Sequence, residues 1–267
     1  MTIVAAHSEV CAFCEGRLVA QWEDIHLWRC NSCGLAFRNP MPVQTELTRL
    51  YEDGWREPEA NQAETGGTDL RLARIYARRL AASLGERDFE GLRIIDFGAG
   101  TGAMSHALRE QGAEVTSVDP FGYERLHAQG LTAYRSLSAI PRGELFDGAV
   151  SLDVVEHLRA PWEDLAELRE RTVPGGWIYV STLNTASANA RLTRGNWREA
   201  RKAGHVVFFD PRALELVLAR AGFVDMRRPR WLVPYTRNPF RAALHTLLQT
   251  FRLETGLRAI AVNGGRP

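Results

Sequence analysis

Residues 91–267 alternate between two periods of hydrophobic and polar positions. Short apolar runs such as LRIIDF (92–97) and FDGAVSL (146–152) are typical of buried strands. Segments such as PWEDLAELRERTV (161–173) and DPRALELVLARAGF (210–223) instead repeat apolar residues every three or four positions, as helices do. Strands and helices that alternate in this way predict a doubly wound, Rossmann-like α/β sheet with ligands at the carboxyl ends of its strands.

The C-terminal third indicates how this sheet ends. A strand predicted within FVDMRRPRWLV (223–233) is followed by a long helix at FRAALHTLLQTF (240–251) and a short apolar strand at RAIAVN (258–263). This order suits a seven-stranded sheet closed by an antiparallel hairpin, with a helical insertion at about residues 236–254.

A helical segment precedes the sheet. TELTRLYED (45–53) predicts a short helix, and Thr68–Glu86 predicts a longer one that Thr68 or Asp69 can cap and Gly85 can end. We therefore assign residues 43–90 to a helical linker or cap, and residues 91–267 to the main domain. Pro40 and Pro42 interrupt any continuing helix or strand at this point, so we assign residues 1–42 to a separate small module.

The four cysteines of the chain all lie in this small module. Cys11, Cys14, Cys30 and Cys33 form the pattern C-x2-C-x15-C-x2-C. In a cytosolic chain this spacing is typical of a structural zinc site, with two thiolates from each turn closing a tetrahedron. Four cysteine ligands leave no open coordination position for catalysis. The alternative is four reduced thiols without a metal.

Composition narrows the classes of function. The 267 residues suffice for one substantial α/β domain and a small module, and the net charge of +1 provides no general attraction to nucleic acid or an anionic membrane. No apolar run reaches the 18 residues of a membrane span, and the N-terminus does not have the pattern of a signal peptide. We expect a cytoplasmic protein with no membrane partner, and nucleic acid is an unlikely partner.

The stretch IIDFGAGTGAMSHALREQG (94–112) has the strand, glycine turn and helix of a nucleotide site. Gly98, Gly100 and Ala103 match the dinucleotide motif G-x-G-x-x-A, and Asp119 lies at about the distance expected for a residue that binds a ribose. Taken alone, this pattern favours NAD. Three features favour S-adenosylmethionine (SAM) instead. These are Asp96 and Gly102, which extend the pattern to D-x-G-x-G-x-G; the lack of a Tyr-x-x-x-Lys dehydrogenase motif; and the C-terminal hairpin order.

With these motifs in order, the segment Leu92–Asn263 resembles the class I SAM-dependent methyltransferases. VVEHL, followed by PGG and STLN, is most similar to small-molecule O-methyltransferases of the ubiquinone-biosynthesis type. The cysteine module followed by GLAFRNP resembles zinc-ribbon methyltransferases among sugar and natural-product tailoring enzymes. The resemblance rests on IIDFGAGTG, SVDP, FDGAVSLDVVEHL, VPGGWIYVSTLN and HVVFFDPRALELVLARAGF.

The resemblance implies a SAM site along the predicted strand ends. Asp119 would accept hydrogen bonds from both ribose hydroxyls, unless it only caps the next helix. Asp96 would lie near the methionine ammonium or satisfy backbone amides of the turn. In many relatives an acidic residue accepts a hydrogen bond from the adenine amino group. This chain has SLSAI (136–140) at that place, so Ser138 or a backbone carbonyl would bind the adenine instead. The expected cofactor residues are Asp96, Gly98, Ala99, Gly100, Gly102, Asp119, Pro120, Ser138 and Asp153.

Methyl transfer requires in-line alignment of donor and acceptor, and a hydroxyl acceptor benefits from a general base. We expect His157 or His205 as that base, with Glu156 orienting or replacing His157; a packing role is the alternative for each histidine. The acceptor pocket is expected from Asn184 and its following loop, Tyr76 and the insertion at 235–251. Within that loop, Arg191, Arg194 and Arg198, with Trp197, would hold an anionic or sugar-nucleotide substrate by charge and stacking; the alternative is a solvated loop whose arginines have no specific role.

The expected function is SAM-dependent methylation of a small molecule, such as a natural product or sugar-derived metabolite, most often at oxygen. The alternative enzyme is an RNA methyltransferase that uses the zinc module to bind its substrate. Against this alternative, the module segment WEDIHLWRC is not basic. A third hypothesis is a non-enzymatic protein, a SAM-binding or degenerate scaffold; the intact turn at residues 98–102 and Asp119 argue against loss of the cofactor but do not bear on the acceptor side.

Overall fold

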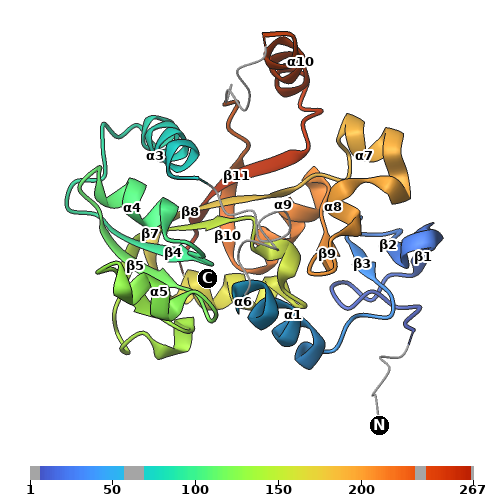
Figure 1. The fold of residues 1–267 in the computed structure, drawn as a ribbon, viewed down its shortest axis with the longest axis horizontal. Helices are drawn as coiled ribbons and strands as arrows, with labels where there is room; N and C mark the ends of the chain where they lie inside the picture. Colours follow the sequence, from blue (N-terminus) through green and yellow to red (C-terminus); the bar gives the residue numbers. More distant parts are fainter. Residues whose placement is uncertain (1–6, 57–68, 232–238, 266–267) are drawn as a thin grey trace.

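The computed structural model describes residues 7–56, 69–231 and 239–265. Its centre is a seven-stranded sheet of order β10-β11-β8-β7-β4-β5-β6 (Figure 1). Strand β11 runs antiparallel to both of its neighbours, and the other pairs are parallel. The predicted doubly wound sheet and its closing hairpin are confirmed. The strands are β4 (Arg93–Phe97), β5 (Glu114–Val118), β6 (Thr132–Tyr134), β7 (Phe146–Leu152), β8 (Thr172–Leu183), β10 (Phe223–Arg227) and β11 (Gly256–Asn263).

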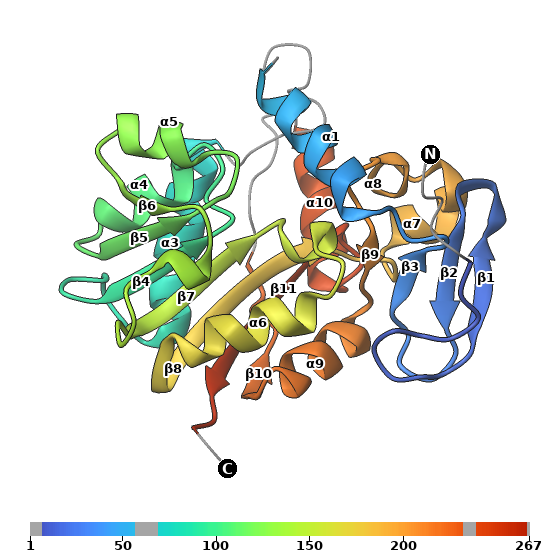
Figure 2. The same cartoon turned by 90° about the horizontal axis from the view of Figure 1, so that it is seen from below.

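Helices cover both faces of this sheet (Figure 2). On one face, α3 and α4 bury Tyr76, Leu80 and Leu108 against the strands, and on the other face α6 and α9 bury Leu165 and Leu214. The helices of the main domain and linker are α1 (Gln44–Arg56), α3 (Leu70–Leu84), α4 (Ala103–Arg109), α5 (Tyr123–Ala128), α6 (Pro161–Glu170), α7 (Ala188–Thr193), α8 (Arg198–Arg201), α9 (Pro211–Arg220) and α10 (Pro239–Thr250). Short 3-10 turns are η2 (Leu137–Ala139), η3 (Val155–His157) and η4 (Arg194–Asn196). Of the helices in the described ranges, none combines the length and apolar character needed to cross a membrane.

The predicted caps of α3 are present. The Asp69 side chain accepts a hydrogen bond from the Leu72 amide, and Gly85 ends the helix in the left-handed conformation, with φ of 85°. Two strand boundaries differ from the prediction. Strand β8 begins at Thr172, which the sequence assigned to the end of the preceding helix, and β10 ends at Arg227 because Pro229 cannot continue the hydrogen-bonded ladder.

The N-terminal module shares a second sheet with the main domain. Strands β1 (Leu18–Trp22) and β2 (Leu27–Cys30), joined by η1 (Glu23–Ile25), form a hairpin that continues through β3 (Ala36–Arg38) to β9 (Val207–Phe208). Strand β9, from the main domain, completes a sheet whose first strand, β1, begins 189 residues earlier in the chain. A boundary at residue 42 remains a prediction, but the module is not an isolated unit.

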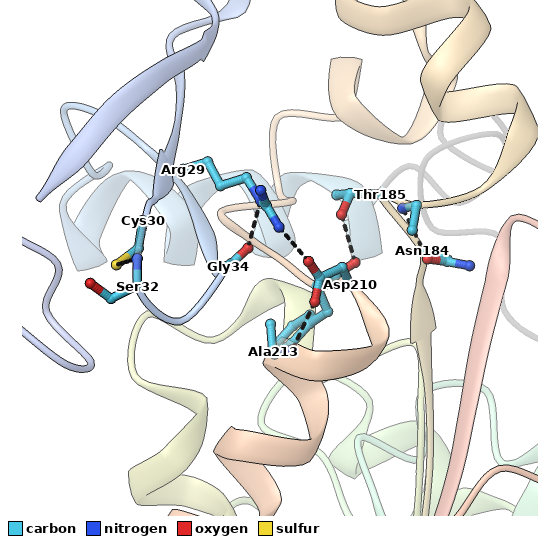
Figure 3. A network of polar contacts seen from close by, with 10 residues as sticks. Arg29, Cys30, Ser32, Gly34, Asn184, Thr185, Asp210 and Ala213 are labelled. Atoms are coloured by element: carbon cyan, nitrogen blue, oxygen red, sulfur yellow. Dashed lines mark hydrogen bonds and ion pairs between the residues drawn. The ribbon is translucent and has the colours of Figure 1, made fainter. Parts of the chain in front are cut away.

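A polar network also connects the module to the main domain (Figure 3). Arg29, next to Cys30, donates to the Gly34 carbonyl at 3.2 Å and pairs with Asp210 at 2.6 Å. The other carboxylate oxygen of Asp210 caps α9 by accepting from the Ala213 amide at 2.8 Å. The cysteine end of the module is thus attached to the start of a core helix.

Candidate active site

The glycine turn between β4 and α4 has the conformation that the sequence predicted. Gly98, Gly100 and Gly102 all have positive φ, at 75°, 54° and 85°. A Cβ on Gly98 would lie 2.2 Å from a methyl carbon of Val154, so the turn also approaches the end of β7 too closely for a side chain. Glycine is therefore required here by both backbone conformation and space. Ala99 is buried within this turn.

Asp119 follows β5 and faces the glycine turn. One carboxylate oxygen accepts from the Gly100 amide at 2.9 Å, and the other accepts from the amides of Phe121 and Gly122 at 2.9 and 2.6 Å. A carboxylate has about four lone-pair positions, so three are occupied in this arrangement. Asp119 does not cap α5, whose N-cap is Gly122; it closes the turn between β5 and α5, and capacity for a further donor remains. Its ribose contacts stay a prediction.

The Asp96 side chain is directed toward helix α4, on the face of the sheet that this helix covers. It is 2% exposed and accepts from the Ser105 hydroxyl at 2.6 Å, while Ser105 also contacts the Ser117 hydroxyl at 2.8 Å. Burial raises the pKa of the Asp96 carboxyl to about 6, against the effect of the Ser105 hydrogen bond. The structure assigns Asp96 to holding the start of α4 against β4, and its contact with the SAM ammonium remains a prediction.

The other expected cofactor residues lie along the same edge of the sheet. Ser138 is exposed in η2 after β6 and contacts the Ser136 hydroxyl at 2.9 Å. Pro120 is exposed after β5. Asp153 is exposed after β7, with φ of 54°, and accepts from the Ser181 hydroxyl at 3.1 Å. These positions suit an elongated ligand across β7, β4, β5 and β6.

Glu156 is a buried carboxyl in η3, directly after β7. It is 2% exposed and accepts from the Thr182 hydroxyl of β8 at 2.7 Å. Burial, and secondarily the negative charge of Asp153, raises the pKa of Glu156 to about 8. The carboxyl is thus mostly protonated at neutral pH.

His157 is held by its Nδ1 atom. That nitrogen lies 3.0 Å from the carbonyl oxygen of Gly204 and 2.7 Å from the hydroxyl of Tyr51, which itself donates to the Gly204 carbonyl at 3.0 Å. Because a carbonyl only accepts, this arrangement assigns the proton of the neutral ring to Nδ1 and leaves the Nε2 lone pair available. Loss of solvation lowers the pKa of His157 to about 4, so the ring is neutral at pH 7.

His205 lies beside His157, with ring centroids 4.7 Å apart. It is 3% exposed, and its Nδ1 is buried without a hydrogen-bond partner among the described residues. Burial, followed by the neighbouring His157, lowers the pKa of His205 to about 2. One ligand atom from each of Glu156, His157 and His205 lies within 4.8 Å of the others. The three residues predicted for catalysis are therefore brought together.

Tyr51 is a site residue that no sequence motif indicates. It lies on α1, and its ring also stacks near Phe121 at 5.2 Å, so α1 crosses the strand edge between the ends of β5 and β7. Its spacing of four residues from the buried Leu47 marks the inward face of that helix. That spacing was visible in the sequence, but the contact with His157, 106 residues away, was not.

The predicted stacking role of Trp197 is wrong. Its side chain is 0% exposed and packs against Trp22, with ring centroids 6.3 Å apart, beneath the module. Arg198 pairs with Glu199 at 2.8 Å, and Arg191 and Arg194 are exposed. The indole is drawn into the core because the loop closes onto the second sheet, so this loop presents no aromatic platform for a ligand.

The cysteines form one cluster. Their Sγ atoms all lie within 4.8 Å of one another, with Cys11 and Cys33 at 3.8 Å and Cys14 and Cys30 at 3.5 Å. The cluster lies in the turns at the ends of β1 and β2, away from the glycine turn of β4.

Comparison with known proteins assigns the class. Residues 69–227 match the family described as a methyltransferase domain, which is more than half of the chain. The chain belongs to this family, and its seven-stranded sheet with flanking helices is the fold of class I SAM-dependent methyltransferases. The resemblance seen in the sequence is confirmed.

Particular relatives are similar over part of their length. A ubiquinone biosynthesis O-methyltransferase of Cereibacter sphaeroides is 39% identical over 123 residues, 42% of this chain and 49% of that protein. The mitochondrial enzyme of that name from Arabidopsis thaliana is 33% identical over 159 residues, 53% of this chain and 49% of the relative. The chain thus spans about half the length of these curated relatives.

Solved structures support the fold. A SAM-dependent methyltransferase from Archaeoglobus fulgidus has a TM-score of 0.54 at 19% identity, covering 80% of this chain and 99% of that one. The 1,6-didemethyltoxoflavin-N1-methyltransferase of Burkholderia thailandensis, solved with S-adenosylhomocysteine, also has 0.54 at 19% identity, covering 86% and 95%.

Proposed function

We propose that this protein is a SAM-dependent methyltransferase that acts on a hydroxyl group of a small molecule. The observation that carries the proposal is the left-handed glycine turn, whose Gly100 amide contacts Asp119, at the same sheet edge as His157 after the neighbouring strand β7. The family membership and the similarity to ubiquinone O-methyltransferases support methyl transfer to oxygen. A natural-product or sugar-derived acceptor and a cytoplasmic location stay predictions.

The residues of the turn fit SAM. Gly100 has open space where a side chain would lie, so a ligand can approach its backbone, and Asp119 retains capacity for a ribose hydroxyl. When bound, SAM supplies a methyl group on a sulfonium, which is already a strong electrophile. The protein's own part is to orient the acceptor and remove its proton.

His157 is the proposed general base. Gly204 and Tyr51 fix its ring through Nδ1, so Nε2 is the atom that takes the proton of the acceptor hydroxyl. His205 packs against the ring and keeps it from rotating away. Glu156, protonated at neutral pH, adds no negative charge beside the base under working conditions.

For the module, the chemistry of the donor set fits a structural zinc ion. A tetrahedral zinc with Zn–S bonds of about 2.3 Å separates its sulfur ligands by about 3.8 Å. The separations of 3.8 Å for Cys11–Cys33 and 3.5 Å for Cys14–Cys30 agree with that value. Four thiolates complete the coordination, so the ion would stabilise the module and take no part in the reaction.

Calorimetric titration of SAM tests the cofactor assignment. Asp119→Ala should weaken SAM binding at least about 10-fold, through loss of a charge-assisted hydrogen bond. Asp88→Ala, an exposed aspartate in the loop before β4, is the matched control and should bind as the wild type does. NADH is titrated in parallel, and circular dichroism checks that each variant is folded. Binding of NADH without SAM would refute the proposal.

A further inference from the structure

A cavity lies where β8 ends and β11 begins. It has a volume of about 220 Å³ and is enclosed by the residues after β10, the end of α10 and the start of β11. Figure 1 shows α10 standing at the start of β11, beyond the end of β8. Four arginines dominate its lining: Arg228, Arg230, Arg252 and Arg258.

The positive charge of this cavity is not balanced by its lining. Glu254 is the carboxylate among the lining residues, and it pairs with Arg258 at 3.3 Å. Within the described part of the chain, no carboxylate lies within ion-pair distance of Arg228, Arg230 or Arg252. Burial, and then the nearby charge of Arg252, lowers the pKa of Arg228. Glu215 and Glu254 act in the opposite direction on Arg228, but four arginines around the one carboxylate among the described lining residues leave an excess of positive charge, which favours an anionic ligand.

The wall of the cavity is rigidly built. Arg258 is 5% exposed, and its guanidinium carbon lies 5.8 Å from the centre of the Tyr76 ring. Tyr76 in turn packs against Trp231, which lines the cavity and donates its indole N–H to Ser83 of α3 at 2.9 Å. An arginine held over an aromatic ring in this way is oriented before any ligand arrives.

The cavity lies on the same sheet edge as the histidines. Asn184, the first residue after β8, contributes to its lining. Arg258 of β11 is opposite Ser181 of β8, and the Ser181 hydroxyl donates to Asp153 at the end of β7. Strands are about 4.8 Å apart, so two strand spacings, or about 10 Å, separate β11 from β7. One small molecule can span that distance.

We propose that this cavity binds an oxyanion, a carboxylate or phosphate, of the small molecule that is methylated. The assignment of that molecule as the methyl acceptor rests on the proposed function. A volume of about 220 Å³ suits one anionic group and its nearest atoms better than a whole ligand. The rest of the acceptor then extends across the end of β8 toward His157.

Calorimetry with simple probes tests the cavity. Benzoate, phenyl phosphate and inorganic phosphate are titrated into the protein saturated with S-adenosylhomocysteine, with neutral benzamide for comparison. The double variant Arg228→Gln/Arg252→Gln should weaken anion binding at least about 10-fold, because each lost guanidinium removes a charge-assisted hydrogen bond. Arg227→Gln is the matched control, since this exposed arginine ends β10 without lining the cavity.

The outcomes separate this inference from the proposed function. Stronger binding of benzoate than of phenyl phosphate would identify a carboxylate, and the reverse order would identify a phosphate. Absence of anion binding in the folded wild type, or equal binding by the double variant, would overturn the cavity assignment alone. The anion titrations are repeated without S-adenosylhomocysteine; if anions bind there while SAM does not, the methyltransferase proposal fails and the anion site stands.

Discussion

Replacing Glu156 by glutamine should make the protein's stability less sensitive to alkaline pH. The carboxyl is 2% exposed and accepts from Thr182. Burial, together with the charge of Asp153, raises its pKa from an ordinary value of 4.5 to about 8. A protonated glutamic acid and a glutamine have the same shape, so Glu156→Gln mimics the form that the folded protein holds at neutral pH.

The magnitude follows from proton linkage. Between pH 4.5 and 8 the folded protein binds a proton at Glu156 that the unfolded chain has released, so the stability from this group falls as pH rises. From pH 6 to pH 8 the loss is about 1.4 kcal/mol per pH unit, on the order of 3 kcal/mol in total, and it levels off above pH 8. The glutamine variant lacks this loss. Below pH 4.5 the two proteins should have similar stability; the variant should be more stable by about 2 kcal/mol near pH 6 and by about 5 kcal/mol at pH 9.

Urea unfolding at pH 6, 7.5 and 9, followed by far-ultraviolet circular dichroism and tryptophan fluorescence, measures this difference. Contributions from titrating groups that do not interact with Glu156 are common to both proteins and cancel. Glu170→Gln, an exposed position at the end of α6, serves as the control and should show a pH-independent difference from wild type. A difference between Glu156→Gln and wild type that is the same at pH 6 and pH 9 would refute the burial argument.

Two further predictions concern the glycine turn and the module. Gly98→Ala should destabilise the protein by about 2–4 kcal/mol in thermal unfolding, because its Cβ would lie 2.2 Å from Val154. Gly100→Ala has open space around it and should cost only about 1–2 kcal/mol for its positive φ; equal losses would contradict this ranking. Chelation of zinc should lower thermal stability and speed hydrogen exchange near His205, whose carbonyl accepts from Arg38 of β3, while SAM affinity is kept. Loss of SAM binding in a protein whose main domain stays folded would show that the module has a different role.

Local chemistry allowed much of the fold to be predicted. Asp69 and Gly85 mark the ends of α3 in the sequence because capping and left-handed backbone depend on residue type alone. The glycine turn was predictable for the same reason, and so was the cysteine cluster, whose spacing brings the thiols into turns. Trp197 shows the limit of such reasoning: an indole in an arginine-rich loop has the same local signal whether it binds a ligand or enters the core.

The sequence by itself determined the class of fold, the conformation of the glycine turn and the cysteine cluster, since each depends on periodicity or spacing over a few residues. Only the tertiary structure decided which side chains meet from distant segments. Tyr51 and Gly204 fix His157, β9 completes the sheet of the module, and arginines on either side of α10 enclose one cavity. These contacts arise when separate hydrophobic faces pack together, and burial then sets the protonation of Glu156 and His157. Neither packing nor desolvation is encoded in any short stretch of the chain.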